Sequence, residues 1–425
     1  MCLTSVRASL LLLLLLPAGA SPGSFSCGAD DHPEDCAALG AVYAATAFAP
    51  TGARLPWPGP SSPSFCGWAY VTCWPDVGGD ATRAVRVLDL HNLVLNGTIP
   101  PELARLSRPQ SIYLYANELS GVIPAALGAL TTLRDLQLDQ NLFTGALPKA
   151  LGRLTNLQYL GFSFNKLSGT LPDAIGNLTS LRTLKGDYNQ LQGTIPASFG
   201  RLTSLVYCVL SYNQLEGAVP ESFGNLSASL FDLELHNNYL TSLPRSLGGL
   251  SSLTSLSVGF NLLSGPIPAE WFGGARGGVG GLRGGFPKLE GLFLENNNFS
   301  GAIPPGLGSL RSLRQLELDH NALTGAVPEA LGGLAQLETL HLNDNALDGP
   351  LPTRLWSNFS HIVSLFLGGT GNRFTPPLPA SLEALACRGG ALSKPGTQCR
   401  MPAGFPKAVC EANPCLVRVC GMVCS

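Results

Sequence analysis

The set of residues in this 425-residue chain that comes nearest to a catalytic arrangement is a pair of carboxylates with a histidine. Glu317 and Asp319 lie two positions apart in LRQLELDHN, and His341 takes the position of Glu317 in the next similar segment. In a strand, such carboxylates share one face about 7 Å apart, and they could act as the acid and base of a glycoside hydrolase. An open, solvated sheet does not readily raise the pKa of an acid. We therefore expect a binding face, and no enzyme.

Other chemical signatures are missing from the sequence. No nucleophile elbow, zinc-protease motif, phosphate-binding loop, kinase signature or dinucleotide fingerprint occurs. The histidines at 91, 236, 320 and 341 fall at different outward positions, so we expect no shared metal site and no cofactor. A glycine-rich stretch with Arg276 and Arg283 superficially resembles a nucleic-acid-binding segment, but the formal net charge is −2. We expect no nucleic-acid partner.

The N-terminus is typical of a secretory signal. Arg7 precedes an apolar leucine run, which ends at the small residues Ala18-Gly19-Ala20. The run is too short to span a bilayer, and no later apolar stretch approaches the required length. We expect a secreted, extracellular chain that begins at Ser21, without membrane insertion after cleavage, at the cell wall or cell surface or free in the extracellular space.

The cysteines of the mature chain form two clusters and one isolated residue. In an oxidising compartment an even cluster at each end predicts disulfide bonds. The clusters are Cys27, Cys36, Cys66 and Cys73 at the front, and Cys387, Cys399, Cys410, Cys415, Cys420 and Cys424 at the back. Cys208 has no cysteine within a hundred residues on either side. Three interpretations of Cys208 are open at this point: a catalytic nucleophile, half of a long-range disulfide, or a buried apolar residue.

A period of 24 residues decides the architecture. Asn117, Asn141, Asn165, Asn189 and Asn213 keep this spacing within the unit L-x-x-L-x-L-x-x-N-x-L-x-G-x-I-P-x-x-L-x-x-L-x-x, which recurs about twelve times. The x-L-x-L-x segment predicts a short strand with its leucines inward. The asparagine predicts a turn, in which its amide bonds backbone groups that no sheet satisfies. One unit cannot bury its own leucines, so the units must stack into a curved parallel sheet. Cys208 falls on a leucine position, which favours the buried apolar residue.

The unit closely resembles that of the plant-type leucine-rich repeat family, whose mark is the L-x-G-x-I-P half. DCAALGAVYAATAF, at 35–48, resembles the family's N-terminal capping helix, and Trp57 followed by CGWAYVTC resembles its cap motif. Tyr70 stands where the family has glycine, and the usual double cysteine is absent. The resemblance implies an α/β solenoid, a horseshoe or superhelix with a parallel concave β-sheet and disulfide caps. It favours the bonds Cys27–Cys36 and Cys66–Cys73.

On this resemblance the chain divides into four segments, and its repeats depart from the regular unit in three places. The segments are a signal peptide at 1–20, an N-terminal cap at 21–84, the repeats at 85–384 with a glycine-rich insert near 269–288, and a cysteine-rich C-terminal cap or tail at 385–425. The copy that begins at Leu230 is one residue short, the insert separates two copies, and the last copy is distorted.

The outward positions predict the binding site. Aromatic residues gather in the middle copies and acidic residues in the later ones, and contiguous exposed aromatics mark binding surfaces. We expect the ligand-binding residues to be Tyr113, Tyr115, Tyr159, Phe164, Tyr188, Tyr207, Tyr212, Phe260, Glu295, Glu317 and Asp319. The N-glycosylation sequons all avoid the outward strand positions, at Asn96, Asn177, Asn225, Asn298 and Asn358. Glycans there would leave the concave face bare.

The pattern therefore favours a secreted recognition module that binds a protein or peptide on its concave face, as a non-kinase partner in cell-surface signalling or defence. One alternative is an inhibitor of secreted cell-wall-degrading enzymes, because inhibitors of the polygalacturonase type share this repeat. The partner is then a secreted enzyme rather than a membrane receptor. A glycan hydrolase that uses Glu317 and Asp319 is the third hypothesis.

Overall fold

The computed structural model describes residues 27–48, 51–53, 55–57, 64–75, 83–273, 285–353, 355–382 and 398–400. The expected signal peptide, most of the glycine-rich insert and most of the C-terminal tail lie outside the described residues. So do the expected disulfide partners Cys387, Cys410, Cys415, Cys420 and Cys424, and the side chain of Cys399. Within the described ranges no helix has the length and apolarity needed to cross a membrane.

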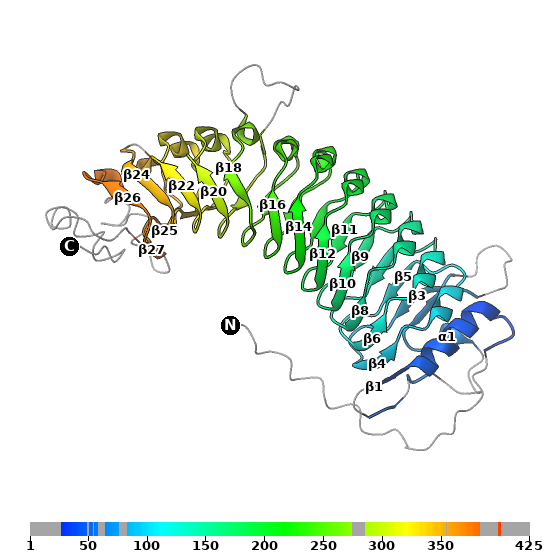
Figure 1. Ribbon diagram of the computed structural model, residues 1–425. Coiled ribbons are helices and arrows are strands. Elements are labelled where there is room, and N and C mark those ends of the chain that lie inside the picture. Colours follow the sequence, from blue (N-terminus) through cyan, green and yellow to red (C-terminus); the bar gives the residue numbers. More distant parts are fainter. Residues whose placement is uncertain are drawn as a thin grey trace.

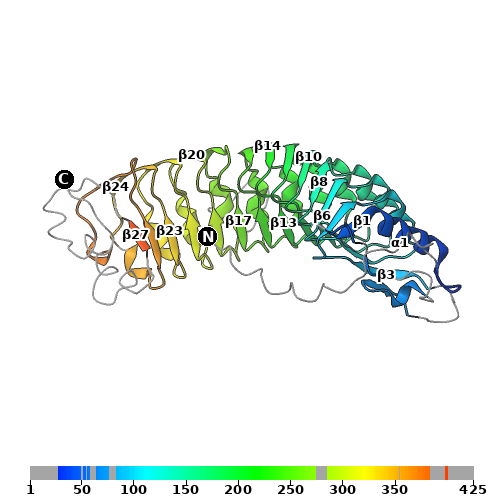
Figure 2. The same cartoon turned by 90° about the horizontal axis from the view of Figure 1, so that it is seen from below.

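The chain forms a curved solenoid, an arc with strands along its inner side and short helical turns along its outer rim (Figure 1). Seen from below the arc, one continuous sheet runs from end to end (Figure 2). This concave sheet consists, in spatial order, of β2 (Val71–Cys73), β3 (Val85–Asp89), β5 (Ser111–Tyr113), β7 (Asp135–Gln137), β9 (Tyr159–Gly161), β11 (Thr183–Lys185), β13 (Tyr207–Val209), β15 (Asp232–Glu234), β17 (Ser255–Ser257), β19 (Gly291–Phe293), β21 (Gln315–Glu317), β23 (Thr339–His341), β25 (Ser364–Phe366) and β27 (Gln398–Arg400).

A second layer of strands follows each asparagine. It divides into two lateral sheets. The first contains β1 (Thr46–Phe48), β4 (Leu95–Thr98), β6 (Glu118–Val122), β8 (Leu142–Gly145), β10 (Lys166–Thr170), β12 (Gln190–Thr194), β14 (Gln214–Ala218) and β16 (Tyr239–Ser242). The second contains β18 (Ser264–Pro266), β20 (Asn298–Gly301), β22 (Ala322–Gly325), β24 (Ala346–Pro350) and β26 (Arg373–Thr375). The sequence pattern did not predict these strands. Their glycines take φ near +75°, as at Gly169 and Gly217, which only glycine adopts without strain.

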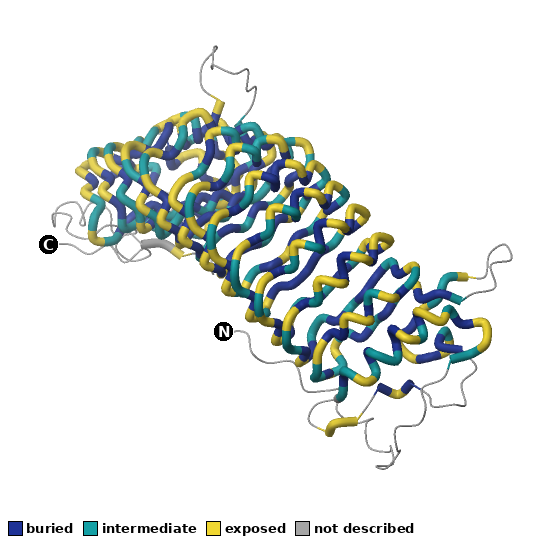
Figure 3. Tube along the Cα trace, turned by 45° about the vertical axis from the view of Figure 1, so that its right-hand side comes forward, coloured by how far each residue is buried: buried dark blue, intermediate teal, exposed yellow. Residues whose placement is uncertain are grey.

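The outer rim consists of 3-10 turns that begin after the proline of each unit, where the fixed proline φ starts the turn. The turns are η2 (Pro101–Arg105), η3 (Ala125–Ala129), η4 (Lys149–Arg153), η5 (Asp173–Asn177), η6 (Ala197–Arg201), η7 (Glu221–Leu226), η8 (Arg245–Gly249), η9 (Ala269–Phe272), η10 (Pro305–Ser309), η11 (Glu329–Gly333) and η12 (Trp356–Asn358). Between the layers the unit's leucines form one continuous core, visible as the buried stripe of each coil (Figure 3).

Asparagine side chains tie each coil to the one before it. The amide of Asn141 donates to the carbonyl oxygen of Leu114 at 2.9 Å, and its carbonyl accepts from the backbone N–H of Leu119 at 3.0 Å. The same pair of bonds recurs at Asn165, Asn213 and Asn345. Backbone groups that no sheet satisfies are thereby paired inside the core, as the recurring asparagine predicted.

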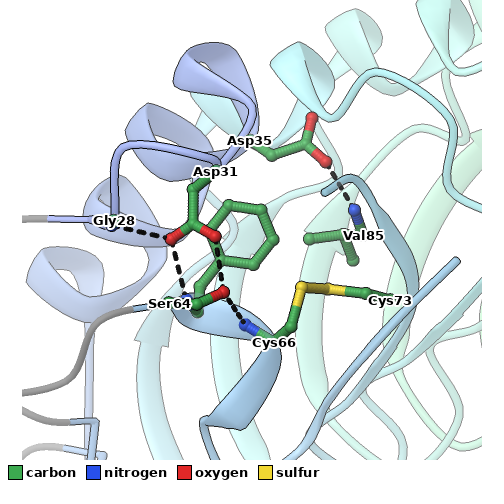
Figure 4. Close-up of a disulfide and its surroundings, with 8 residues drawn as sticks. Gly28, Asp31, Asp35, Ser64, Cys66, Cys73 and Val85 are labelled. Carbon is green, nitrogen blue, oxygen red and sulfur yellow. Dashed lines mark hydrogen bonds between the residues drawn. A yellow bond between two sulfur atoms is a disulfide. The ribbon is translucent and has the colours of Figure 1, made fainter. Parts of the chain in front are cut away.

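The N-terminal cap closes the first coil. Helix α1 (Pro33–Ala45) ends three residues earlier than the sequence pattern suggested, because Thr46–Phe48 forms β1 and pairs with β4 instead. The disulfides Cys27–Cys36 and Cys66–Cys73 both form. Asp31 accepts from the backbone N–H groups of Gly28 and Phe65 and from the hydroxyl of Ser64, and all of these groups surround the second disulfide (Figure 4).

Asp35 makes the longest connection of the cap. It is fully buried, and its two carboxylate oxygens accept from the backbone N–H groups of Val85 and Ser107, each at 2.6 Å. One side chain of α1 therefore holds the first strand of the repeats and the end of the first 3-10 turn. Buried charge is tolerated in proteins when it is hydrogen-bonded in this way.

Cys208 lies in the core, as the repeat predicted. It pairs in register with Leu184 on β11 and has no exposed surface, and burial raises the pKa of its thiol to about 12. Cys208→Ala is expected to lower the free energy of unfolding by about 1 kcal/mol, since it leaves a small cavity. Chemical denaturation measures this change. Rapid labelling of Cys208 by a thiol reagent in the native protein would contradict its burial.

Candidate ligand-binding face

Three stacked rings form the most ordered feature of the exposed surface. The centroids of Phe164 and Tyr188 are 4.3 Å apart and those of Tyr188 and Tyr212 are 4.1 Å apart, with the ring planes within 13° of each other. The three residues are 47%, 42% and 39% exposed. We call Phe164, Tyr188 and Tyr212 the aromatic ladder. It offers a flat apolar strip that a partner could cover.

The backbone under the ladder is in an unusual conformation. Phe164, Tyr188 and Tyr212 have φ of 53°, 52° and 52°, the left-handed region that asparagine and glycine favour and that costs other residues about 1 kcal/mol or more. Each lies three residues beyond the end of its strand, β9, β11 or β13, so the rings line the edge of the concave sheet rather than its centre. The same position is left-handed in other repeats, as at Ala116, Gln140 and Asp344, so this backbone is a property of the repeat that sets the direction of the three rings.

Phe260 continues this row beyond a gap. It has the same left-handed backbone and is 49% exposed, but Asn237 occupies the position between it and Tyr212. The ring of Tyr212 meets His236 edge-on instead, with centroids 5.2 Å apart. The predicted row is thus a ladder of three rings and one separate ring.

The remaining predicted tyrosines are spread over the face. Tyr115 stacks on His91 at 4.6 Å between centroids, near the N-terminal end. Tyr113 is partly buried on β5. Tyr207 is 41% exposed and meets Phe231 edge-on at 6.1 Å. Phe231 is 43% exposed and was not predicted, because its position just before the strand had not been counted as outward.

A hollow in the middle of the face was missed by the sequence analysis. Its lining includes Asp139, Tyr159, Lys185, Asp187 and Glu234. Burial, together with repulsion from the carboxylates of Asp139 and Asp187, raises the pKa of Tyr159 to about 12. The available signal was the charged outward residues Lys185 on β11 and Glu234 on β15. We call this the central hollow.

Glu234 is the most perturbed acid of the central hollow. Burial is the main cause that raises its pKa to about 7, and the neighbouring carboxylates of Asp232 and Asp187 add to it. Lys185 partly offsets the rise. The ionised form of Glu234 is therefore costly, and a cationic group from a ligand would stabilise it.

The later repeats bring the predicted acids together. Glu317 lies directly opposite His341 in the β21–β23 register, and ligand atoms of Glu317, Asp319 and His341 all lie within 4.8 Å of one another. Glu295 lies one repeat earlier. It is close enough to Glu317 and Asp319 for the three negative charges to repel one another. We call Glu295, Glu317, Asp319 and His341 the acidic cluster.

The other acids of this region are already paired. The guanidinium of Arg314 binds the carboxylate of Glu338 at 2.6 Å and approaches that of Glu290 at 3.9 Å. Both contacts are at the exposed edge of the sheet, where ion pairs contribute little to stability. Because the guanidinium of Arg314 pairs with Glu338 and Glu290, it does not neutralise the charge of the acidic cluster.

The acidic cluster is less solvated than we expected for an open sheet. Burial is the main cause that raises the pKa of Glu295, to about 7, and burial also raises the pKa of Asp319. The argument that such a sheet cannot raise the pKa of an acid is therefore wrong here. Neighbouring side chains cover these carboxylates, although the strands themselves form an open surface.

Glu295→Gln tests this electrostatic strain. Because the folded state holds the Glu295 proton up to about pH 7, against an ordinary pKa of 4.5, the free energy of unfolding falls as pH rises between these values. The variant removes the cost, so its melting temperature at pH 8 should exceed that of the parent by about 1 °C, the shift that about 1 kcal/mol produces in a chain of this length. At pH 4.5 the two should melt together. Glu290→Gln is the matched control, and an equal gain in it would contradict the assignment.

The sequons lie away from the concave sheet. Asn177, Asn225 and Asn358 belong to the outer turns η5, η7 and η12, and Asn96 and Asn298 to the lateral strands β4 and β20. All except the partly buried Asn96 are exposed. Glycosylation itself stays a prediction.

Comparison with known proteins agrees with this architecture. A family model described as a leucine-rich repeat region matches residues 110–266, and a leucine rich repeat model matches 287–347 and 311–371. The chain is a leucine-rich repeat protein of the plant type. No curated protein sequence matches it significantly.

Several solved structures resemble this leucine-rich repeat protein. The ectodomain of the plant membrane receptor kinase GASSHO1/SCHENGEN3 from Arabidopsis thaliana, in complex with CASPARIAN STRIP INTEGRITY FACTOR 2, is 33% identical with a TM-score of 0.71, over 82% of this chain and 39% of that one. The PEPR1–AtPEP1 structure is 35% identical with a TM-score of 0.64, over 76% and 46%. The plant peptide hormone receptor RGFR1 with RGF2 is 30% identical with a TM-score of 0.65, over 76% and 51%. The chain thus spans about two fifths to one half of these structures.

Proposed function

We propose that this protein is an extracellular recognition module that binds a peptide or a protein segment along its concave face. The observation that carries the proposal is the aromatic ladder, whose exposed rings are stacked and held on a left-handed backbone. Rigid aromatic rings bury large areas at a small entropic cost and are common binding hot spots. A ladder without a partner would leave this apolar area in water.

The charge of the face favours a partner with basic groups. The central hollow and the acidic cluster both contain carboxylates whose ionised form is destabilised by burial. A ligand lysine or arginine would offset that cost. Electrostatic attraction of this kind mainly raises the association rate and weakens with salt.

Three structural relatives support a peptide or protein as the ligand. The structures of GASSHO1/SCHENGEN3, PEPR1 and RGFR1 contain CASPARIAN STRIP INTEGRITY FACTOR 2, AtPEP1 and RGF2 respectively. We extend this property to the present chain, as a partner in cell-surface signalling or defence that acts outside the cell.

Capture from extracellular fluid tests the proposal. The mature chain and a variant that carries Tyr188→Ala and Tyr212→Ala are immobilised in parallel, and bound polypeptides are identified by mass spectrometry. A basic polypeptide retained by the parent and lost from the variant is the expected result. The proposal fails if every captured polypeptide binds both chains equally. An assay of the parent against plant cell-wall polysaccharides addresses the hydrolase hypothesis, and retention of a secreted wall-degrading enzyme would favour the inhibitor.

A further inference from the structure

The acidic cluster has an arrangement that the binding of a basic ligand does not require. Glu317 ends β21, Asp319 lies two residues after that strand, and His341 ends β23. One donor atom from each of these side chains lies within 4.8 Å of the other two. Two carboxylates and one imidazole on adjacent strands form three corners of a coordination site. The sequence predicted no metal site because the histidines fall in different rows, but this site needs only one of them.

Asp319 is buried without a complete set of partners. The residue is 9% exposed, and its Oδ1 atom is buried and has no hydrogen-bond partner. Its Oδ2 atom is 3.8 Å from the ring of His320, which is too long for a hydrogen bond. A carboxylate oxygen withdrawn from water without a donor is costly, so such an atom calls for an explanation.

Glu295, in the preceding repeat, also has a buried carboxylate oxygen, Oε2, without a hydrogen-bond partner. The carboxylate lies where a side chain at Gly259 would stand, since a Cβ atom there would be 2.1 Å from Oε1 of Glu295. Gly259 therefore leaves the space that allows the third acidic side chain to lie beside Glu317 and Asp319.

The ring of His341 is fixed with one nitrogen free for coordination. Nε2 lies 2.7 Å from the hydroxyl of Ser364, and the ring stacks on Phe366 with centroids 4.5 Å apart. Nδ1 faces Glu317 at 3.7 Å. A hydrogen bond from the distal nitrogen is the usual way in which proteins orient a metal-binding histidine.

From this geometry we infer that the acidic cluster binds a zinc ion through Glu317, Asp319 and Nδ1 of His341. Mixed nitrogen and oxygen donors suit Zn²⁺, whereas Ca²⁺ and Mg²⁺ prefer oxygen alone. With metal–ligand bonds of about 2.1 Å, donors around the ion lie about 3–4 Å apart, so small side-chain rotations close the site. Glu295 lies beside these three ligands and is not one of them.

Isothermal titration of the intact mature chain with Zn²⁺ tests the site. The parent should bind one equivalent that Ca²⁺ does not displace. Asp319→Asn exchanges a charged carboxylate for a neutral amide, and His341→Gln removes the imidazole. Each should weaken zinc binding by more than about tenfold, since loss of an outer-shell partner already costs that much. Ser364→Ala removes only the partner of Nε2 and should weaken zinc binding by about tenfold. Glu338→Gln, which removes a carboxylate from the same repeat outside the cluster, should bind like the parent.

The outcomes separate the possibilities. Absence of binding to the parent overturns the inference, as does binding that Asp319→Asn and His341→Gln both leave unchanged, because the ion then sits elsewhere in the chain. If a donor variant does not fold, zinc-dependent thermal stabilisation of the parent and its reduction in Ser364→Ala decide the question. If the parent binds no zinc, and Asp319→Asn weakens the binding of a basic peptide, the cluster holds a cationic side chain of the ligand. That result refutes the zinc site.

Discussion

Asp35→Ala is expected to lower the free energy of unfolding by about 3 kcal/mol, because the buried backbone N–H of Val85 and the partly buried N–H of Ser107 lose their acceptor. Each such loss costs about 1–3 kcal/mol. The damage should spread from the end of the solenoid. The first repeat loses its cover, and stacked repeats are stabilised mainly by their neighbours.

Trp57 and Trp68 provide the measurement. Their rings are 5.6 Å apart within the cap. Trp271 and Trp356 are buried in the later repeats, so the measurement is made in a background with both replaced by phenylalanine, where tryptophan fluorescence during denaturation reports on this end of the chain. Asp35→Asn keeps one acceptor oxygen and should lose less stability than Asp35→Ala. Asp30→Ala changes an exposed residue of the same segment and should have little effect. A loss below about 1 kcal/mol in Asp35→Ala would show that water replaces the carboxylate and would refute its role.

Tyr188→Ala and Tyr212→Ala are each expected to weaken binding of the captured partner by roughly 2 kcal/mol, or about thirtyfold. Each change removes an exposed ring and also the stacking that orients its neighbour. The double variant should therefore lose less than the sum of the two, since residues in contact are not additive. The melting temperature should stay unchanged, because neither ring is part of the core.

Tyr239→Ala is the matched control for the ladder. Tyr239 is 54% exposed on β16, in the lateral sheet, so its loss should not affect binding. Surface plasmon resonance with the captured partner gives the rates. The ladder is not the binding site if the double variant keeps the parent's affinity, or if Tyr239→Ala loses as much.

The parts of the fold that the sequence predicted are those with a local cause. Alternating leucines predicted the concave strands, the asparagine predicted its own hydrogen bonds, and the register of the repeat placed Cys208 beside Leu184. The lateral strands were missed because L-x-G contains too few apolar residues to indicate a strand. Their pairing comes from neighbouring coils, not from local propensity.

The candidate site was predictable only in part, for a similar reason. Residue type indicated the ladder and the acids, but not the stacking of the rings or the burial of Glu295 and Asp319. These depend on side chains from neighbouring repeats, such as the space that Gly259 leaves. The role of Asp35 was missed because its partners lie 50 and 72 residues away, where no repeat spacing applies.

The division of the lateral strands between β16 and β18 has a mechanical consequence. The concave sheet continues across this point through β15, β17 and β19, while the flank changes from one lateral sheet to another. At this point the flank is joined by the hydrogen bond from the N–H of Leu262 to the carbonyl oxygen of Leu240, at 2.9 Å, instead of by a pair of lateral strands. The solenoid should therefore bend most readily here. We expect the arc to bend between β16 and β18. The aromatic ladder lies before this point and the acidic cluster after it, so bending would change the distance between the two parts of the binding face (Figure 1).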